Sequence, residues 1–508
     1  MNLQVMEDRI YELIVQASAR LPLDVRTRLE QAIKQEDPTS KSAMALRKIL
    51  QNLEIAKARQ APICQDTGLP TFLFHLPRGG TLHQMEVEHL VQKAIVRATR
   101  DGSLRPNSVD PLTGENSGDN LGPMTPIIYI KEWTRPTIGV QLILKGGGCE
   151  NKSTQYSLPC ELDGLGYAER DLAGIRKCIL HAVWQAQGQG CSPGFIGVGI
   201  GSDRAGGYAL AKQQLFRTLD DTNKNPVLQQ LEGQILAEAN TLDIGTLGFG
   251  GDVTLLGCKI DTANRLPASF FVSIAYMCWA FRRVGFELDE ETGEITEWHD
   301  YVDTDDRNSR PQQKRLDQKT IALQTPISEE TVRKLKVGDV VEIHGMMYTG
   351  RDEIHRYLAS DDAICPVDLG GQIIYHCGPV MLKNENSEWH VLAAGPTTSS
   401  REEPYQADVI KKFGVRAIVG KGGMGDKTGK ALQELGGVYL NAIGGAAQFY
   451  ADCVTSVNGV DFLEFGIPEA MWHLNVQGVK AVVTMDTFGN SLHKDTLDTS
   501  FEKLQKLK

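Results

Sequence analysis

The chain of 508 residues has no apolar run long enough to cross a lipid bilayer. Its longest apolar stretch extends from Pro267 to Phe281 and is interrupted by Ser269 and Ser273. A membrane-spanning helix needs about 20 consecutive apolar residues. We therefore interpret this stretch as buried core and expect no contact with a membrane.

The chain also has fewer basic than acidic residues. The chain has 53 Lys and Arg residues against 64 Asp and Glu residues, which gives a net charge of −11. Nucleic acid binding depends on neutralising phosphates, so this balance argues against a nucleic acid partner. If the ligand is a small anion, the attraction must come from a few local Arg and Lys residues.

The N-terminus shows no targeting signal, and the cysteines show no familiar metal motif. The first residues carry Glu7 and Asp8 and no basic segment followed by an apolar block, which predicts a cytoplasmic location. The ten cysteines should then be reduced thiols. No two of them form the Cys-x-x-Cys pair typical of zinc sites and ferredoxins, so their spacing alone does not reveal a cluster.

The composition is that of a folded protein, with 41% hydrophobic and 23% charged residues. A chain of this length exceeds one hydrophobic core, so we expect two or three domains. Apolar residues recur with helical spacing in residues 4–20, 41–59 and 84–100, whereas residues 127–130 and 140–144 are typical of strands.

A change of composition between residues 286 and 322 predicts a linker, because charged and polar residues dominate there. The predicted layout is an α/β protein with a larger N-terminal α/β domain over residues 1–285. After the linker, residues 323–508 would form a smaller, β-rich C-terminal domain.

The segment Pro62–Pro70 places Cys64, Gln65 and Asp66 between a helix and a Gly-Leu-Pro turn. Such a loop can direct three polar side chains at one point. The alternative is an ordinary turn in which the Asp bonds its own backbone. Cys191 and Cys278 are equally ambiguous in isolation, since a buried cysteine is usually a small hydrophobe.

Glycine-rich segments do not indicate a nucleotide site. In Gly197-Val198-Gly199-Ile200-Gly201 the third glycine comes one residue too early for a dinucleotide fingerprint. A nicotinamide dehydrogenase is therefore disfavoured.

In the C-terminal half, basic residues stand beside small ones on predicted turns at Arg351, Arg401 and Lys421. The backbone of a Gly-rich turn can approach a ligand closely, and Arg can bind a carboxylate with two hydrogen bonds. The alternative is a set of exposed turn charges.

Taken in order, these motifs resemble those of class I, iron–sulfur-dependent fumarases and of the similar two-subunit L-tartrate dehydratases. The resemblance covers nearly the whole chain. The shared motifs are Ile63-Cys64-Gln65-Asp66-Thr67-Gly68, Lys145-Gly146-Gly147-Gly148, Gly350-Arg351-Asp352, Gly395-Pro396-Thr397-Thr398 with Arg401, and Lys421-Gly422.

The resemblance implies a hydro-lyase of the tricarboxylic acid cycle that converts fumarate to L-malate with a [4Fe-4S] cluster. Three thiolates match the cluster ligands of the family, namely Cys64, Cys191 and Cys278. One iron then lacks a protein ligand and can act as a Lewis acid on a substrate oxygen.

The resemblance also implies the roles of the pocket residues. Asp66 matches the general acid and Thr397 the base, and a threonine hydroxyl needs electrostatic activation by Lys421 or Arg401 to serve as one. The residues that match substrate-binding positions are Gln65, Arg105, Gly148, Arg351, Arg401 and Lys421.

One position departs from the family pattern, because Leu266 stands where members commonly have His before Pro-Ala-Ser. If this residue lies near the substrate, a methyl-substituted dicarboxylate such as mesaconate would be favoured, since one buried methylene contributes roughly 0.8 kcal/mol.

The sequence leaves several alternative functions open. Mesaconate hydratase and L-tartrate dehydratase fit the same motifs, and an iron–sulfur sensor without turnover is a further alternative. The resemblance implies a cluster-binding N-terminal domain, a swivelling β/β/α C-terminal domain that clamps the substrate, an active site between them, and a homodimer.

Overall fold

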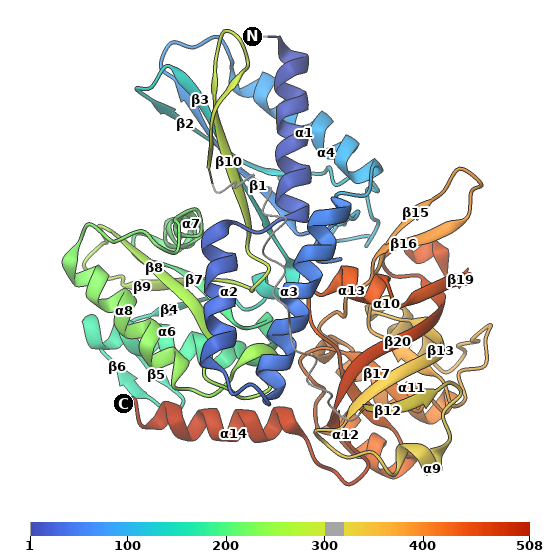
Figure 1. The fold of residues 1–508 in the computed structure, drawn as a ribbon. Helices are drawn as coiled ribbons and strands as arrows, with labels where there is room; N and C mark the ends of the chain where they lie inside the picture. The colour runs from blue at the N-terminus through green and yellow to red at the C-terminus, as the bar shows by residue number, and fades with distance from the viewer. Residues whose placement is uncertain (1, 300–319) are drawn as a thin grey trace.

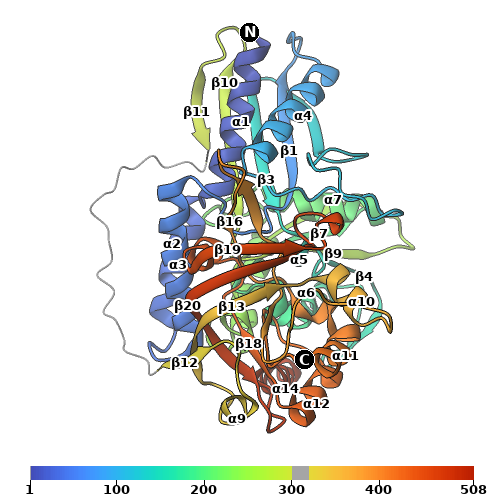
Figure 2. The same ribbon diagram turned by 90° about the vertical axis from the view of Figure 1, so that its right-hand side faces the viewer.

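The computed structural model describes residues 2–299 and 320–508. The fold is mixed α/β, as expected, and is built on three larger sheets and two small hairpins. Figures 1 and 2 show two of the larger sheets within residues 2–299 and the third within residues 320–508. These two ranges are called the first and second halves of the chain. No helix in these two described ranges is both long and apolar enough to cross a membrane.

A five-stranded sheet with the order β11-β10-β3-β1-β2 forms the upper part of the molecule in Figure 1. Two helices, α1 and α4, pack against each other beside it, and α1 contacts β3 and β10. The elements of this part are α1 (Leu3–Ala19), β1 (Leu69–Pro77), α4 (Gln84–Arg100), β2 (Ile127–Trp133), β3 (Thr137–Lys145), β10 (Arg282–Asp289) and β11 (Ile295–His299).

A four-stranded sheet with the order β4-β9-β7-β8 lies at the lower left of Figure 1 among helices. All eight residues of β7 are buried, which explains why this glycine-rich segment lacks the alternation of a half-exposed strand. The elements are α5 (Gly147–Glu150), β4 (Thr154–Ser157), β5 (Cys160–Leu162), β6 (Gly166–Ala168), α6 (Leu172–Ala186), η1 (Gln187–Gly190), β7 (Gly194–Gly201), α7 (Arg204–Gln214), α8 (Pro226–Asn240), η2 (Thr246–Gly248), β8 (Leu255–Ala263) and β9 (Phe271–Met277).

A seven-stranded sheet with the order β12-β13-β14-β17-β18-β20-β19 organises residues 320–508. Its strands are β12 (Thr320–Gln324), β13 (Val340–Thr349), β14 (Ile373–Tyr375), β17 (Ala417–Gly420), β18 (Val438–Asn441), β19 (Val454–Asp461) and β20 (Met471–Met485). The other elements are α9 (Glu329–Val332), α10 (Asp352–Leu358), β15 (Val380–Lys383), β16 (Trp389–Ala393), η3 (Ser399–Arg401), α11 (Glu403–Phe413), α12 (Asp426–Leu435), α13 (Ala447–Ala451), η4 (Leu463–Phe465) and α14 (Leu492–Gln505).

Two helices, α2 (Leu23–Gln35) and α3 (Lys41–Arg59), lie between the four-stranded and seven-stranded sheets in Figure 1. The last helix, α14, runs back along the bottom of the molecule and packs against α6. One continuous hydrophobic core accordingly contains residues from both halves, such as Ile63, Trp279, Tyr375 and Leu504.

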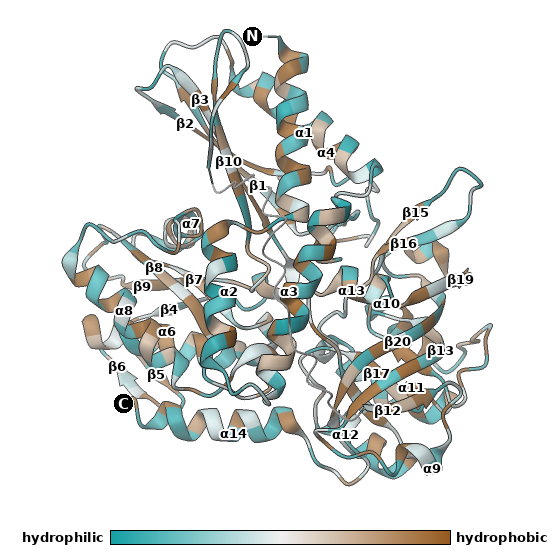
Figure 3. Ribbon diagram, in the orientation of Figure 1, coloured by the Kyte–Doolittle hydropathy of each residue, from teal (hydrophilic) through white to brown (hydrophobic). Residues whose placement is uncertain are grey.

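Hydrophobic residues concentrate along the strands, whereas helices such as α14 combine polar and apolar positions (Figure 3). This pattern is expected because buried strands are apolar on both faces and surface helices are apolar on one. Within the predicted linker, residues 286–299 include the end of β10 and the strand β11, and residues 320–322 begin β12. The intervening residues 300–319 lie outside the described residues, and the division into domains stays a prediction.

Candidate active site

A cavity of about 510 Å³ lies where loops from both halves of the chain meet. The structure brings together in its wall every predicted catalytic and substrate-binding residue. These residues are Gln65, Asp66, Arg105, Gly148, Arg351, Thr397, Arg401 and Lys421.

The carboxylate of Asp66 lies among cations and backbone amides. Its Oδ1 is 3.9 Å from Arg105 Nη2, and its Oδ2 accepts a hydrogen bond of 3.4 Å from the Gly148 amide. Burial alone would raise the pKa of Asp66, but Arg105, Arg282 and Lys421 together lower it below its usual range. Asp66 is therefore ionised at neutral pH in the free protein.

Arg105 connects the two halves of the chain. Its Nε donates to Asn107 Oδ1 at 2.8 Å, and its Nη1 donates to the carbonyl of Gly378 at 2.6 Å. Burial, reinforced by the neighbouring Arg351, lowers the pKa of Arg105 to about 10. The guanidinium remains charged at neutral pH, and Arg105 lines the cavity, where it can bind an anion.

Thr397 and Arg401 are joined by a direct hydrogen bond from Arg401 Nη2 to Thr397 Oγ1 at 2.9 Å. The amide of Thr397 donates to the carbonyl of His376 at 2.7 Å, and its carbonyl accepts from the Lys421 amide at 3.2 Å. The backbone is thus fixed at both ends. A guanidinium that donates to this hydroxyl would stabilise the alkoxide, which is the form of a threonine side chain that can accept a proton.

Gln65 is held in place by the loop of the second half that contains Gly395 and Pro396. Its Nε2 donates to the carbonyl of Pro396 at 3.1 Å. A Cβ atom at Gly395 would lie 2.1 Å from Gln65 Oε1. Only glycine permits this contact, which explains the glycine before Pro396 in the second half of the chain.

Cys64, Cys191 and Cys278 gather around the turn at Gly444 and Gly445. The Trp279 amide donates to the carbonyl of Cys191 at 3.2 Å, and the Trp279 indole donates to the carbonyl of Gly444 at 2.9 Å. Asn52 Nδ2 donates to the carbonyl of Ile63, beside Cys64, at 3.0 Å and to that of Gly445 at 3.4 Å. The three thiols are thus brought to one region from three distant segments.

The surroundings of these thiols suit an anionic cluster. Lys421 Nζ donates to Cys191 Sγ at 3.0 Å. A Cβ atom at Gly444 would lie only 2.7 Å from the same sulfur, so this glycine leaves space beside it. Burial raises the pKa of Cys64, while Arg282 and Lys421 oppose that rise. Cations that stabilise thiolates favour metal ligation, since the thiolate is the ligand form.

Arg282 is a site residue that the sequence analysis missed. It is 1% exposed, and its Nη2 donates to the carbonyl of Asp66 at 2.8 Å. Its Nε and Nη1 have no hydrogen-bond partner among the described residues. Buried donors are rarely left unpaired, so two free guanidinium donors near Cys64 and Cys278 fit an anionic group bound there. Its signal in the sequence is a pair of arginines inside an otherwise apolar segment.

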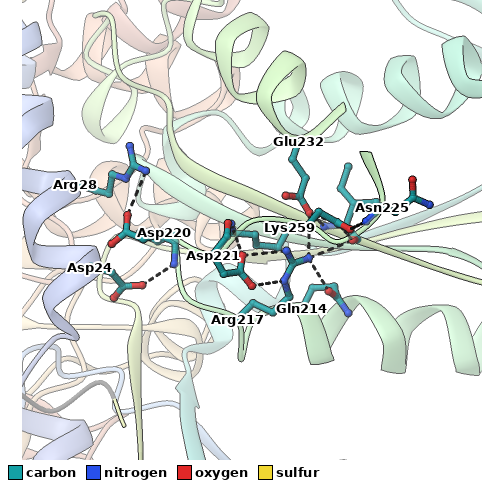
Figure 4. Close-up of polar contacts among 12 residues, drawn as sticks. Asp24, Arg28, Gln214, Arg217, Asp220, Asp221, Asn225, Glu232 and Lys259 are labelled. Carbon is teal, nitrogen blue, oxygen red and sulfur yellow. Dashed lines mark hydrogen bonds and ion pairs between the residues drawn. The ribbon is translucent and has the colours of Figure 1, made fainter. Parts of the chain in front are cut away.

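The outer wall of the cavity comes from α7 and the loop after it, with Lys212, Leu215 and Phe216. Figure 4 shows how a polar network fixes this loop around Arg217. Arg217 donates to both carboxylate oxygens of Asp221, at 2.7 and 3.0 Å, and Lys259 Nζ lies 2.6 Å from the same carboxylate. This wall was not predictable from the sequence motifs, because its residues are spread over ordinary helix and loop positions.

The hypothesis about Leu266 is wrong. This residue is 73% exposed and does not line the cavity, because it belongs to the turn between β8 and β9. An apolar side chain there gives no contact through which a methyl-substituted substrate would be favoured.

Among residues 2–299 and 320–508, one group of His, Cys, Asp or Glu side chains has its ligand atoms within 4.8 Å of one another, and it does not include Cys64, Cys191 or Cys278. It comprises Glu287, Glu297 and His299 at the edge of the five-stranded sheet. Glu287 is already paired with Arg135 and accepts a hydrogen bond from Thr137. The cluster does not line the cavity, and its contacts explain it as part of the sheet edge.

Comparisons with known proteins give a consistent result. Two family models match, described as "Fumarate hydratase (Fumerase)" over residues 7–287 and "Fumarase C-terminus" over residues 293–496. A protein of Geobacillus stearothermophilus named "Putative fumarate hydratase class I" is 60% identical over 513 residues, covering 100% of this chain and 99% of that protein.

Two shorter relatives from Methanocaldococcus jannaschii each match one half. The protein named "Putative L(+)-tartrate dehydratase subunit alpha" is 35% identical over 283 residues, which are 55% of this chain and 95% of its own length. The protein named "Putative L(+)-tartrate dehydratase subunit beta" is 42% identical over 187 residues, which are 36% of this chain and 95% of its own length.

Proposed function

Because the chain belongs to the class I fumarate hydratase family, we propose that it is a hydro-lyase that reversibly adds water to fumarate to give L-malate. The observation that carries this proposal is the cavity itself, where Asp66, Thr397 and several fixed cations from both halves of the chain meet. A four-carbon dicarboxylate presents a negative charge at each end, and Arg and Lys are the side chains that bind such groups.

The proposed binding mode follows from the positions of these cations. Arg105, Arg351, Arg401 and Lys421 would bind the two carboxylates, with Gln65 and the Gly148 amide as further donors. Negative charge develops on a carboxylate during hydration, and preorganised cations stabilise it as it forms.

Asp66 and Thr397 are the proposed proton-transfer groups. In the free protein Asp66 is ionised, so it is ready to accept a proton, and it donates one only after it has been protonated. The hydroxyl of Thr397 would exchange a proton on the other side of the substrate, with Arg401 Nη2 stabilising its charged form.

We also propose that Cys64, Cys191 and Cys278 hold a [4Fe-4S] cluster. Such a cluster, when bound, supplies a Lewis-acidic iron for a substrate oxygen. The free donors of Arg282 and the cation of Lys421 support the fit of this donor set. The homodimer and the cytoplasmic location stay predictions.

The test uses protein purified without oxygen and reconstituted with iron and sulfide. We expect broad visible absorbance and rapid formation of L-malate from fumarate, with mesaconate and tartrate assayed in parallel. Asp66→Asn should keep the absorbance and lose at least about 100-fold in rate, the usual contribution of a proton-transfer group. Absorbance without turnover of any of the three substrates would support an iron–sulfur sensor instead.

L-tartrate dehydratase is the second candidate, because relatives with that name match each half of the chain. Faster turnover of tartrate than of fumarate in the same assay would establish it.

A further inference from the structure

Glu402 is a buried acid for which the proposed reaction gives no role. It is 0% exposed, and neither of its carboxylate oxygens has a hydrogen-bond partner among the described residues. Its backbone is fixed between η3 and α11, since its amide donates to the Ser399 carbonyl at 3.1 Å and its carbonyl accepts from the Gln406 amide at 2.9 Å. An unpartnered carboxyl group in such a place calls for an explanation.

Glu402 follows Arg401 in the chain and interacts electrostatically with both Arg401 and Arg351, two arginines of the proposed carboxylate clamp. Arg351 and Arg401, the acid Asp352, and Tyr439 on β18 are the charged and titratable groups that interact with it. One turn further along α11, Gln406 bonds His376, whose ring stacks edge-on against that of His355 with centroids 4.8 Å apart. These are the titratable groups that η3, α10, α11, β14 and β18 place around Glu402.

The two arginines are already balanced by other acids. Arg351 Nη1 is 3.0 Å from Glu469 Oε1, and Arg401 Nη2 is 3.4 Å from Asp352 Oδ2. Two guanidinium groups and two carboxylates have a net charge of zero. An ionised Glu402 would give this group a net charge of −1 beside the place where a dianion is to bind.

Burial favours the neutral form of Glu402. An ionised carboxylate without hydrogen bonds is costly in a low-dielectric interior. Burial accordingly raises the pKa of Glu402 to about 8, although Arg401 opposes the rise. The Nε groups of Arg351 and Arg401 are buried and have no hydrogen-bond partner among the described residues, so an ionised Glu402 would attract both guanidinium groups away from the ligand.

We propose that Glu402 is a positioning residue of the clamp, which carries a proton while a dicarboxylate is bound and so leaves Arg351 and Arg401 to the ligand. This inference rests on the proposed function for the identity of the ligand. Loss of the proton would place a third carboxylate in competition with the substrate, whereas the groups that transfer protons to the substrate would be unaffected.

The sign of the pH effect follows from this linkage. At pH 7 and below, Glu402 is mostly neutral and binding is strongest. As the pH rises through 8, each binding event must take up a proton, so KM should approach a tenfold rise per pH unit while kcat changes less than twofold. Glu402→Gln fixes the neutral form and should reduce the change in KM between pH 7 and pH 9.5 to less than twofold.

The test measures kcat and KM for fumarate from pH 6 to pH 9.5 in the reconstituted holoenzyme, below the pKa of about 10 of Arg105. Asp408→Asn serves as a matched control, because it removes the same charge from an exposed position of α11 that pairs with Lys427. The control should keep the wild-type profile, and Glu402→Asp should restore the pH dependence. If Glu402→Gln fails to fold, Glu402→Met provides the neutral side chain. A wild-type KM that stays constant to pH 9.5, or a rise that persists in Glu402→Gln, would overturn the inference.

A binding measurement separates this inference from the proposed reaction. Calorimetric titration with succinate, an unreactive four-carbon dicarboxylate, at pH 8.5 in two buffers of different ionisation enthalpy gives the number of protons taken up. We expect roughly 0.8 proton for the wild type and none for Glu402→Gln. If succinate binding takes up a proton but fumarate is not turned over, the proposed reaction is wrong and the proposed role of Glu402 is still supported. If succinate binds without proton uptake, or does not bind at all, the proposed role of Glu402 is wrong.

Discussion

At the scale of single residues, the cavity depends on arginines whose geometry a lysine does not reproduce. Arg401 reaches Thr397 Oγ1 at 2.9 Å and Asp352 Oδ2 at 3.4 Å with Nη2, and its side chain lines the cavity. A planar guanidinium offers two parallel donors to a carboxylate, whereas the ammonium of lysine is a point charge.

We therefore expect Arg401→Lys to lower kcat/KM for fumarate by about 10- to 100-fold. Hydrogen bonds to charged groups contribute about 1.5–3 kcal/mol, and a tenfold change corresponds to about 1.4 kcal/mol. Steady-state kinetics check this, with Arg416→Lys as the control, since Arg416 pairs with Glu329 outside the cavity. Unchanged kcat and KM in Arg401→Lys would show that Arg401 does not contact the substrate.

At the scale of secondary-structure elements, β10 shows how one strand serves two purposes. Adjacent residues of a strand face opposite sides, and Arg282 and Arg283 illustrate this at its start. Arg282 lies near the cysteines with two free donors. Arg283 instead lies 2.7 Å from Asp24 and donates to the Arg217 carbonyl at 2.7 Å, which fixes the loop that carries the outer wall.

Substitution of these neighbours should separate the two purposes. Arg283→Met breaks a buried ion pair and should lower the free energy of unfolding of the apoprotein by about 3–5 kcal/mol. Arg282→Met removes a buried cation with unpaired donors, so it should cost little stability but reduce iron retention after anaerobic gel filtration. Thermal denaturation and iron content distinguish the variants. Equal iron retention in both would show that Arg282 has no part in cluster binding.

Elements with a clear periodic pattern were predictable from the sequence. The predicted helices 4–20, 41–59 and 84–100 are confirmed as α1, α3 and α4, nearly to the residue. The buried strand β7 was less clear, because a strand that is covered on both faces has no alternation to detect. Arg282 was missed for a related reason, since its role depends on which distant segments β10 meets.

At the scale of the whole molecule, the site is assembled from both halves of the chain. The predicted residues form a single cavity wall although they are up to 356 positions apart in the sequence, from Gln65 to Lys421. Direct contacts across the halves include Arg105 to the Gly378 carbonyl and Lys421 to Cys191. The ordered motifs predicted which residues these are, but the contacts that place them depend on the packing of sheets distant in sequence.

This arrangement predicts that the chain can be divided without loss of the site. The relatives that match each half are separate chains named as subunits. Co-expressed fragments 1–309 and 310–508 should associate through the shared core that contains Ile63 and Tyr375. They should purify together through a tag on one fragment and hydrate fumarate within about threefold of the intact chain. The break falls outside the described residues, between strands of two different sheets.

A break elsewhere provides the matched control for the divided chain. Fragments 1–465 and 466–508 separate β19 from β20, which are neighbours in the seven-stranded sheet. The short fragment would have to supply an inner strand of that sheet, since β20 lies between β18 and β19. We expect the long fragment to be insoluble, because its sheet would expose unpaired backbone groups on both sides of the missing strand. If both pairs of fragments gave active complexes, association of the fragments would not depend on leaving each sheet intact. If fragments 1–309 and 310–508 failed to associate, the shared core would require a continuous chain.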